Sequence, residues 1–359
     1  MQAFNYAALP GKVLFGFGTL ARVSDEIRAL GCSRAIVLST PEQETTAQAV
    51  KAQIGELAAG VVPWATMHTP TDVTERAMAA VQSMRGDCVV AVGGGSTTGL
   101  GKAIALRTDM PQIVIPTTYA GSEATPILGE TRDGIKTTQR SLKVLPEVIL
   151  YDVDLTMTLP PALSATSGMN AIAHAAEALY AQDANPIVSL IAEEGVRALA
   201  SALPAIIANP GDREARSDAL YGAWACGVCL GSVGMALHHK LCHVLGGSFD
   251  LPHAPTHTVI LPYAIAYNAA AAPGAMKRLS RALGAPEAAK GLFDLARSLG
   301  APTSLQAIGM PQEGLDRAAD LAVQNPYWNP RAIERGAIRA LLDDAYFGRA
   351  PSSSAERDA

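Results

Sequence analysis

The sequence predicts two domains: a Rossmann-like α/β domain with a parallel sheet in residues 1–157, and an all-α domain in residues 158–350. Two observations lead to this prediction. Short apolar segments rich in valine and isoleucine alternate with helical segments over the first 150 residues, which is typical of a doubly wound sheet. Alanine-rich segments with helical spacing then dominate the rest of the chain. A chain of 359 residues, 49% of them hydrophobic, can bury a core in each domain.

Five short segments are expected to form strands of the first domain. They are apolar throughout, as strands buried on both faces should be, and they span 13–16, 35–39, 88–92, 112–116 and 147–152. Helices are expected between them over 44–59 and 73–84. This alternation of strand and helix predicts that the strands run parallel.

The composition changes at residues 156–168, beyond which β-branched runs almost disappear. One exception is the segment TVILP at 258–262. Helices are expected over 169–181, 187–208, 214–231, 233–245, 275–284, 286–299, 313–323 and 331–345. The tail, 351–359, is polar and is expected to be flexible.

Charge and cysteine usage narrow the possible partners and location. The net charge of −5 argues against nucleic acid, which requires a basic surface. We expect neither a membrane span nor a signal peptide, because no apolar run approaches about 20 residues and the N-terminus lacks a basic region before an apolar stretch. Five scattered cysteines indicate free thiols in a reducing cytoplasm. Cys226 and Cys229 form a CxxC without a second pair, so we expect them to pack between helices.

A glycine-rich loop, GGGSTTGLGK at 93–102, follows the strand expected at 88–92. Gly93, Gly94 and Gly95 let the backbone approach a ligand closely, and Ser96 is expected to cap the following helix, whose free N–H groups favour a pyrophosphate. The loop matches neither GxGxxG nor a P-loop. The loop is interpreted as a nucleotide site, and the alternative is an ordinary βα turn.

A second loop follows the next expected strand and carries hydroxyl groups. Thr117, Thr118 and Ser122 lie in PTTYAGSEAT at 116–125. Because open α/β sheets bind ligands at the carboxyl ends of their strands, we expect these hydroxyls to contact the same ligand. The alternative is a solvated loop.

Six of the seven histidines fall in two short stretches, 168–174 and 238–257. Asn170 and His174 are four residues apart, as are His239 and His243, so each pair lies on one face of a helix. His253 follows after a loop. An aspartate at position 170 would complete a divalent-metal site, whereas asparagine lacks the charge. Three interpretations of these residues are left open. One is a zinc-like site of His174, His239 and His253. The second is an anion receptor built from protonated imidazoles, and the third is a group of histidines in the core.

Together these segments resemble the iron-containing alcohol dehydrogenase family. The matching motifs are GGGSTTGLGK at 93–102, PTTYAGSE at 116–123, GMNAIAHAAE at 168–177 and HKLCHVLG at 239–246. The resemblance implies the fold shared with dehydroquinate synthase, with an active site in the cleft between the domains. Three departures stand out. Asn170 replaces a metal-binding aspartate, Gly99 replaces an aspartate of the phosphate loop, and the second loop is one residue short, with Tyr119 and Ala120.

These departures, with the segment at 222–247, resemble the maleylacetate reductase branch of the family. The resemblance implies reduction of the carbon–carbon double bond of maleylacetate to give 3-oxoadipate, in the degradation of aromatic compounds. It implies NADH or NADPH as cofactor and no required metal. His243 is the first candidate for proton donor and His253 the second. His239 and His174 would orient or bind the substrate carboxylates, with Asn170 as a neutral partner.

The cofactor is expected to make further contacts. Lys136 occupies a family position near the nicotinamide and is a candidate for catalysis as well as binding, while Thr40 and Leu155 are expected contacts. No acid stands at the end of the second strand, which should allow NADPH. Glu42 and Glu44 follow closely and could reverse this.

Three other functions remain as alternatives. One is a metal-dependent alcohol dehydrogenase that acts on a small alcohol or aldehyde. Another is a lyase of the dehydroquinate synthase type, and the third is a nucleotide-binding protein without catalysis. The favoured interpretation is a cytoplasmic homodimer that takes a small dicarboxylate.

Overall fold

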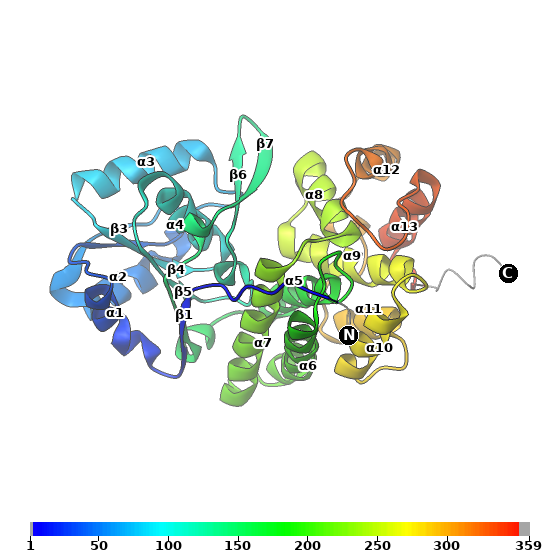
Figure 1. Ribbon diagram of the computed structural model, residues 1–359, viewed down its shortest axis with the longest axis horizontal. Coiled ribbons are helices and arrows are strands. Elements are labelled where there is room, and N and C mark those ends of the chain that lie inside the picture. The colour runs from blue at the N-terminus through cyan, green and yellow to red at the C-terminus, as the bar shows by residue number, and fades with distance from the viewer. Residues whose placement is uncertain (1–2, 352–359) are drawn as a thin grey trace. The chain divides into compact units, whose positions relative to one another are not determined.

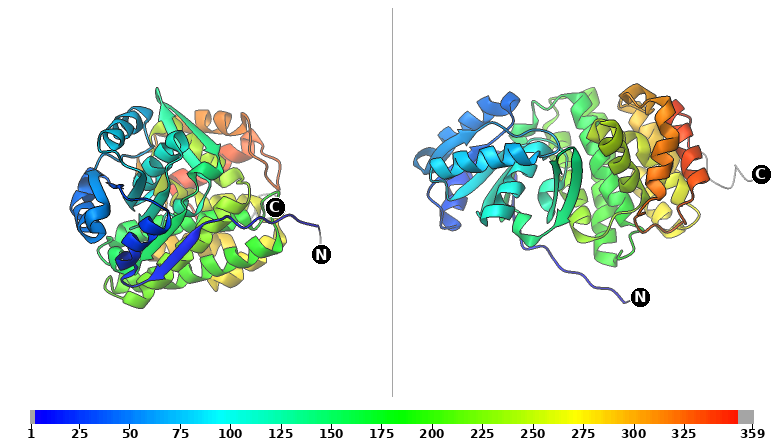
Figure 2. Two further views of the ribbon diagram at one scale, coloured as in Figure 1. Left: turned by 60° about the vertical axis from the view of Figure 1, so that its left-hand side comes forward. Right: turned by 90° about the horizontal axis from the view of Figure 1, so that it is seen from above.

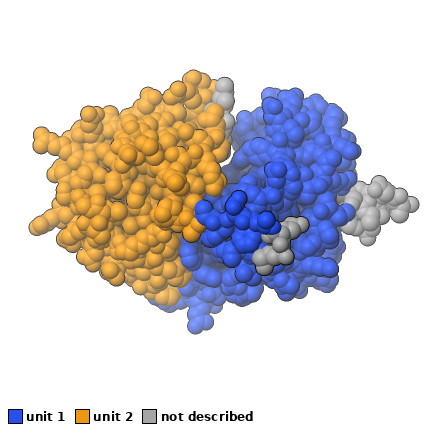
Figure 3. All heavy atoms as spheres, in the orientation of Figure 1, with its two compact units in different colours: residues 1–7, 160–359 blue, residues 8–159 orange. Residues whose placement is uncertain are grey.

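The computed structural model describes residues 3–351, and the chain divides into two compact units (Figure 3). One unit is Ala8–Leu159 and the other is Pro160–Ala359 with Met1–Ala7. The first is α/β and the second is helical, so the predicted fold class is confirmed. Apart from Pro351, the tail predicted to be flexible, 351–359, lies outside the described residues.

The α/β unit holds a six-stranded parallel sheet with the order β1-β8-β5-β4-β2-β3 (Figure 1). Its strands are β1 Lys12–Gly16, β2 Ala35–Leu38, β3 Ala58–Val62, β4 Cys88–Gly93, β5 Gln112–Pro116 and β8 Val148–Asp152. The five predicted strands are all present. The sixth strand, β3, was not predicted, and the helix expected over 44–59 runs into its first two residues. That helix, α2 Glu44–Ile54, stops because Gly55 follows it with φ 69°, a conformation that favours glycine and ends helices.

Helices cover both faces of this sheet, as two further views show (Figure 2). Helices α1 Val23–Ala29 and α2 pack against one face, and α3 Thr71–Ser83 and α4 Gly95–Thr108 pack against the other. Neighbouring residues of β2 point to opposite faces of the sheet. Val37 packs in the core beneath α1 and α2, and Leu38 packs in the core beneath α3 and α4. Strands buried on both faces need apolar residues throughout, which is why they could be recognised from the sequence.

A separate antiparallel hairpin, β6 Ile127–Arg132 and β7 Ile135–Arg140, was not predicted. The two residues of its turn, Asp133 and Gly134, have φ values of 50° and 75°. Two consecutive positive φ values are typical of the tight turn that Asp-Gly favours between antiparallel strands. The polar composition of 132–140 concealed this signal.

In the other unit, all the regular secondary structure of the described residues is helical. Its helices are α5 Pro161–Ala178, α6 Pro186–Ala208, α7 Arg213–Ser232, α8 Leu237–Phe249, α9 His253–Asn268, α10 Pro273–Leu283, α11 Ala288–Ser298, α12 Leu315–Val323 and α13 Arg335–Phe347. Helix α9 was not predicted, because the β-branched run at 258–262 lies inside it. No single described helix is both long enough and apolar enough to cross a membrane. The bent pair α7 and α8, at 96°, passes that test only when the two are joined.

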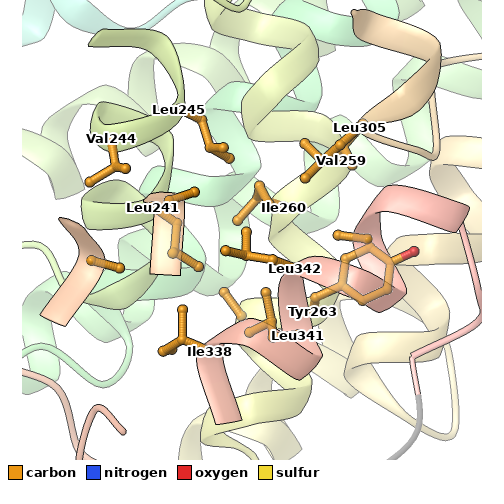
Figure 4. Close-up of a cluster of buried hydrophobic side chains, with 14 of the residues drawn as sticks. Leu241, Val244, Leu245, Val259, Ile260, Tyr263, Leu305, Ile338, Leu341 and Leu342 are labelled. Atoms are coloured by element: carbon orange, nitrogen blue, oxygen red, sulfur yellow. The ribbon is translucent and has the colours of Figure 1, made fainter. Parts of the chain in front are cut away.

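A hydrophobic cluster fixes the helices that carry the histidines. Leu241 and Leu245 of α8 pack with Val259 and Ile260 of α9 and with residues of α13 such as Leu342 (Figure 4). On α8 the leucines are four residues apart and bury one side of the helix. The histidines at 239 and 243 have the same spacing on a different side, so packing of the leucines determines where the imidazoles point.

Candidate active site

The glycine loop lies where doubly wound sheets bind nucleotides. It joins β4 to α4 at the carboxyl edge of the sheet, and the strand order reverses between β2 and β4. Gly93 has φ 151°, and a Cβ atom there would lie 2.5 Å from Thr97 Oγ1 and 2.6 Å from Gln43 Oε1. At Gly94 it would lie 3.0 Å from Thr118 Cγ2. A side chain at Gly93 would therefore clash, and one at Gly94 would require Thr118 to shift by a few tenths of an ångström.

The start of α4 differs from the sequence prediction. The helix begins at Gly95, its N-cap residue is Gly94, and no side chain caps it. Ser96 therefore lies inside the first turn and does not cap the helix as predicted. The three glycines allow the chain to enter the helical conformation one residue before Ser96. The free N–H groups of this first turn form a site that suits a phosphate anion.

The loop after β5 packs directly on the glycine loop. The Thr117 N–H donates to the Gly93 carbonyl oxygen at 3.0 Å, and the Gln43 amide donates to Thr117 Oγ1 at 2.9 Å. Ser122 Oγ is buried and, among the described residues, has no hydrogen-bond partner. A buried hydroxyl without a partner is costly, and this one lies 3.8 Å from the Cβ position of Gly95. The predicted residues of the two loops, including Thr118, are therefore brought together.

Lys102 holds the second loop in place, a role that the sequence analysis missed. Its ammonium group is buried and donates to the carbonyl oxygens of Ser122, Thr125 and Ile127 at 2.6–2.9 Å. Burial lowers the pKa of Lys102 to about 7, and the nearby Glu123 carboxylate opposes that change. Lys102 contacts the chain itself and is a positioning residue of the loop.

The remaining predicted cofactor contacts belong to other segments of the α/β unit. Thr40 follows β2 at the point where the strand order reverses, and its carbonyl oxygen accepts from Ser39 Oγ at 2.9 Å. Leu155 is half-buried and packs against the core on the side of α1 and α2. Lys136 lies in β7, and its side chain is outside those that the structure describes.

The helical unit gathers six imidazoles, here termed the imidazole cluster. They are His174, His238, His239, His243, His253 and His257. Helix α5 supplies the first, α8 the next three and α9 the last two. His174 Nδ1 lies 2.9 Å from His239 Nε2, and His174 Nε2 lies 3.3 Å from Asn170 Nδ2. The spacing argument on α5 and α8 therefore brings Asn170, His174 and His239 together.

A buried carboxylate fixes the inner side of the cluster. Glu177 is fully buried and accepts from His239 Nδ1 at 2.7 Å and from the backbone N–H groups of Ala236 and His238 at 2.8 and 2.6 Å. It therefore stabilises the N-terminus of α8 and orients the His239 ring. The sequence analysis did not single out Glu177, although it lies three residues after His174 on the same helix.

The deepest imidazoles are neutral. His238 and His257 are buried, and their pKa values lie well below the ordinary range because burial disfavours their charged forms and neighbouring histidines oppose them. The hypothesis of protonated imidazoles therefore does not apply to these two. Neutral imidazoles retain a lone pair for a proton or a cation.

The outer side of the cluster is accessible. His253 is exposed and its ring lies 4.4 Å from that of His257. His243 is half-buried, and its Nδ1 lies 2.9 Å from the hydroxyl of Tyr327. His243 and Tyr327 line a cavity of about 280 Å³, together with Lys240, Val244, Ser248, Leu321, Gln324 and Asn325. Tyr327 was missed, because no local pattern links it to a histidine 84 residues away.

Comparison with known proteins identifies the family. A profile of the iron-containing alcohol dehydrogenases matches residues 10–153, and a profile of the C-terminal domain of the Fe-containing alcohol dehydrogenase family matches 164–346. The chain belongs to the iron-containing alcohol dehydrogenase family. It is 59% identical to the maleylacetate reductase of Rhizobium sp. (strain MTP-10005) over 98% of this chain and 100% of that protein.

Solved structures of this family agree with the fold. That of maleylacetate reductase from Agrobacterium tumefaciens matches with a TM-score of 0.95 and 58% identity, covering 98% of this chain and 100% of that one. The iron-containing alcohol dehydrogenase from Corynebacterium glutamicum matches with a TM-score of 0.93 and 43% identity, covering 97% and 98%.

Family membership corrects one expectation. An iron-containing family implies an iron cofactor, so the prediction that no metal is required is wrong. By the chemistry of their donor atoms, the residues present suit an iron ion, although they are not among the described groups whose ligand atoms already converge. Asn170 Oδ1 is buried and has no hydrogen-bond partner among the described residues. With the imidazoles of His174, His239 and His253 it provides one oxygen and three nitrogen donors, which divalent iron accepts.

Proposed function

We propose that this chain is a maleylacetate reductase, an oxidoreductase that saturates the carbon–carbon double bond of maleylacetate to give 3-oxoadipate. The observation that carries the proposal is likeness over 98% of the chain, at 59% identity, to a maleylacetate reductase. Asn170 supports it within the family. A neutral amide among the imidazoles repels a dicarboxylate less than an aspartate would.

NADH or NADPH is the proposed reductant, held by the two loops at the carboxyl edge of the sheet. The side-chain-free backbone at Gly93 and Gly94, the first turn of α4 and the unpartnered Ser122 hydroxyl fit a pyrophosphate. Glu42 lies beside Thr40 at the end of β2, and its pKa is lowered by its own backbone N–H and by the Thr40 hydroxyl. An ionised Glu42 favours NADH over the 2′-phosphate of NADPH.

NADH or NADPH bound there would supply a hydride to the alkene carbon β to the ketone. Negative charge then develops on the ketone oxygen, and an imidazole N–H of the cluster stabilises it. His243 is the proposed proton donor to the adjacent carbon, because it is accessible and the Tyr327 hydroxyl fixes its ring. His239 is oriented by Glu177 and is therefore a fixed donor or acceptor for substrate.

Iron bound by Asn170, His174, His239 and His253 would polarise the ketone oxygen of the substrate. Glu177 would then act behind His239, since a carboxylate on the far ring nitrogen raises the basicity of a ligating imidazole. Lys240, whose ammonium group donates to the Gln324 carbonyl oxygen at 2.8 Å, lines the cavity beside His243 and would offer a cation to a substrate carboxylate.

We further propose a cytoplasmic homodimer that acts in the breakdown of aromatic compounds, with neither nucleic acid nor a membrane as partner. All five cysteines are free and buried, which suits a reducing compartment. Cys226 and Cys229 lie inside α7, as expected for packing residues.

The test is steady-state oxidation of NADH by the purified full-length protein, with maleylacetate and, separately, with a simple aldehyde such as propanal. We expect kcat/KM for maleylacetate to exceed that for the aldehyde by at least about a thousandfold, since buried polar groups discriminate strongly between substrates. Comparable values, or a preference for the aldehyde, would favour an alcohol dehydrogenase instead.

A further inference from the structure

We propose that His238, Cys242 and His257 form a second cation site, which binds a zinc-like divalent ion through two imidazoles and one thiolate. The site is separate from the position that family membership assigns to iron, because none of its three residues belongs to that donor set. The proposal does not depend on the identity of the substrate.

The three ligand atoms already converge. His238 Nε2 lies 3.0 Å from His257 Nδ1 and 3.7 Å from Cys242 Sγ, and all three atoms lie within 4.8 Å of one another. The separations of 3.0 and 3.7 Å are near the roughly 3.3 Å between nitrogens and roughly 3.6 Å between nitrogen and sulfur that a tetrahedral zinc requires, given bonds of about 2.0–2.1 Å to nitrogen and about 2.3 Å to sulfur. The donors come from one turn of α8, at positions i and i+4, and from the facing side of α9.

Burial distinguishes this group from a surface cluster. His238, Cys242 and His257 are 0%, 4% and 1% exposed. His238 Nδ1 and His257 Nε2 are buried and, among the described residues, have no hydrogen-bond partner. A pair of neutral imidazoles with one unsatisfied nitrogen each is an expensive way to fill a core. These two nitrogens lie on the far sides of the rings, and a cation would bind the other two, which face each other.

The chemistry of the donors also suits an ion. An imidazole nitrogen that carries no proton has a lone pair that can bind a cation. On binding, the Cys242 S–H bond breaks, a metal–sulfur bond forms and one proton leaves to solvent. The thiolate charge would partly compensate a second divalent ion close to the first, as the rings of His257 and His239 are 5.1 Å apart. One thiolate and two imidazoles favour zinc over magnesium or calcium.

Cobalt titration of the full-length protein tests the site directly. Metal would be removed by dialysis against a chelator and Co²⁺ added back. Only a cobalt–thiolate bond gives an intense charge-transfer band in the near ultraviolet, and the predicted iron donors include no sulfur. We expect this band in the wild type, with one proton released for each thiolate formed. A wild-type protein that shows no band would overturn the proposal, whatever the variants do.

Variants then assign the band. Cys242→Ser and His257→Gln should abolish it or weaken it at least about tenfold, with circular dichroism confirming that they fold. The matched control is Cys88→Ser, because Cys32, Asp87 and Cys88 form the other thiol-containing group with metal-ligand spacing among the described residues. Loss of the band in Cys88→Ser with retention in Cys242→Ser would place the thiolate in the α/β unit and refute the site.

Discussion

Asn170 shows how a single neutral side chain changes the electrostatics of the imidazole cluster. It shares one face of α5 with His174, and its oxygen is buried with no hydrogen-bond partner in the described part of the chain. The i, i+4 rule was enough to predict that Asn170, His174 and His239 come together. It could not predict Tyr327, which the fold brings to His243 from a loop far along the chain. Contacts of that kind depend on packing, for which a short segment of sequence carries no signal.

At the scale of single residues, the role of His243 as proton donor can be tested by substitution. Replacing it by alanine should lower kcat at least about a hundredfold, as loss of a positioned proton donor usually does, while the dissociation constant for NADH changes less than about threefold. Stopped-flow turnover and fluorescence titration with NADH measure the two quantities. Tyr327→Phe, which keeps the ring but loses the hydroxyl at His243, should have a smaller effect of about tenfold. Equal losses of turnover and NADH affinity in His243→Ala would contradict its role as donor.

At the scale of helices and strands, segments with one dominant pattern were predictable and mixed segments were not. The five buried strands have continuous apolar runs, so they were recognised. Strand β3 was hidden because its alanines continue the composition of α2, and α9 because its β-branched run resembles a strand. In α9 tertiary packing outweighs local preference, since Val259 and Ile260 enter a large core.

Lys102 of α4 makes the stability of the protein depend on pH, because its pKa differs between the folded and the unfolded chain. Burial lowers that pKa from 10.5 to about 7 in the folded protein. Between these values the unfolded chain binds one more proton than the folded chain, so the free energy of unfolding rises with pH. Relative to Lys102→Met, the wild type should therefore gain on the order of 2 kcal/mol between pH 7 and pH 9. Urea unfolding of both proteins measures this difference, and a difference that stays flat or falls with pH would show that Lys102 remains charged when folded.

At the scale of the whole molecule, the change of composition at 156–168 lies beside the end of the first compact unit, Ala8–Leu159. The sequence separates the units well because strands and helices have different apolar periods. The family motifs were informative for a different reason. They are spread over both units, and chance rarely places four of them in order. What the motifs left undetermined is the metal, for which family membership outweighed the substitution at Asn170.

The position of the transferred hydrogen tests the central claim most directly. The protein would reduce maleylacetate with NADH that carries deuterium on the transferred position of C4, and the product would be examined by NMR. We predict 3-oxoadipate with deuterium on the carbon β to the ketone, next to a carboxylate, and with the ketone intact. Deuterium on the former carbonyl carbon, in a hydroxy acid that retains its double bond, would contradict a maleylacetate reductase and identify an alcohol dehydrogenase.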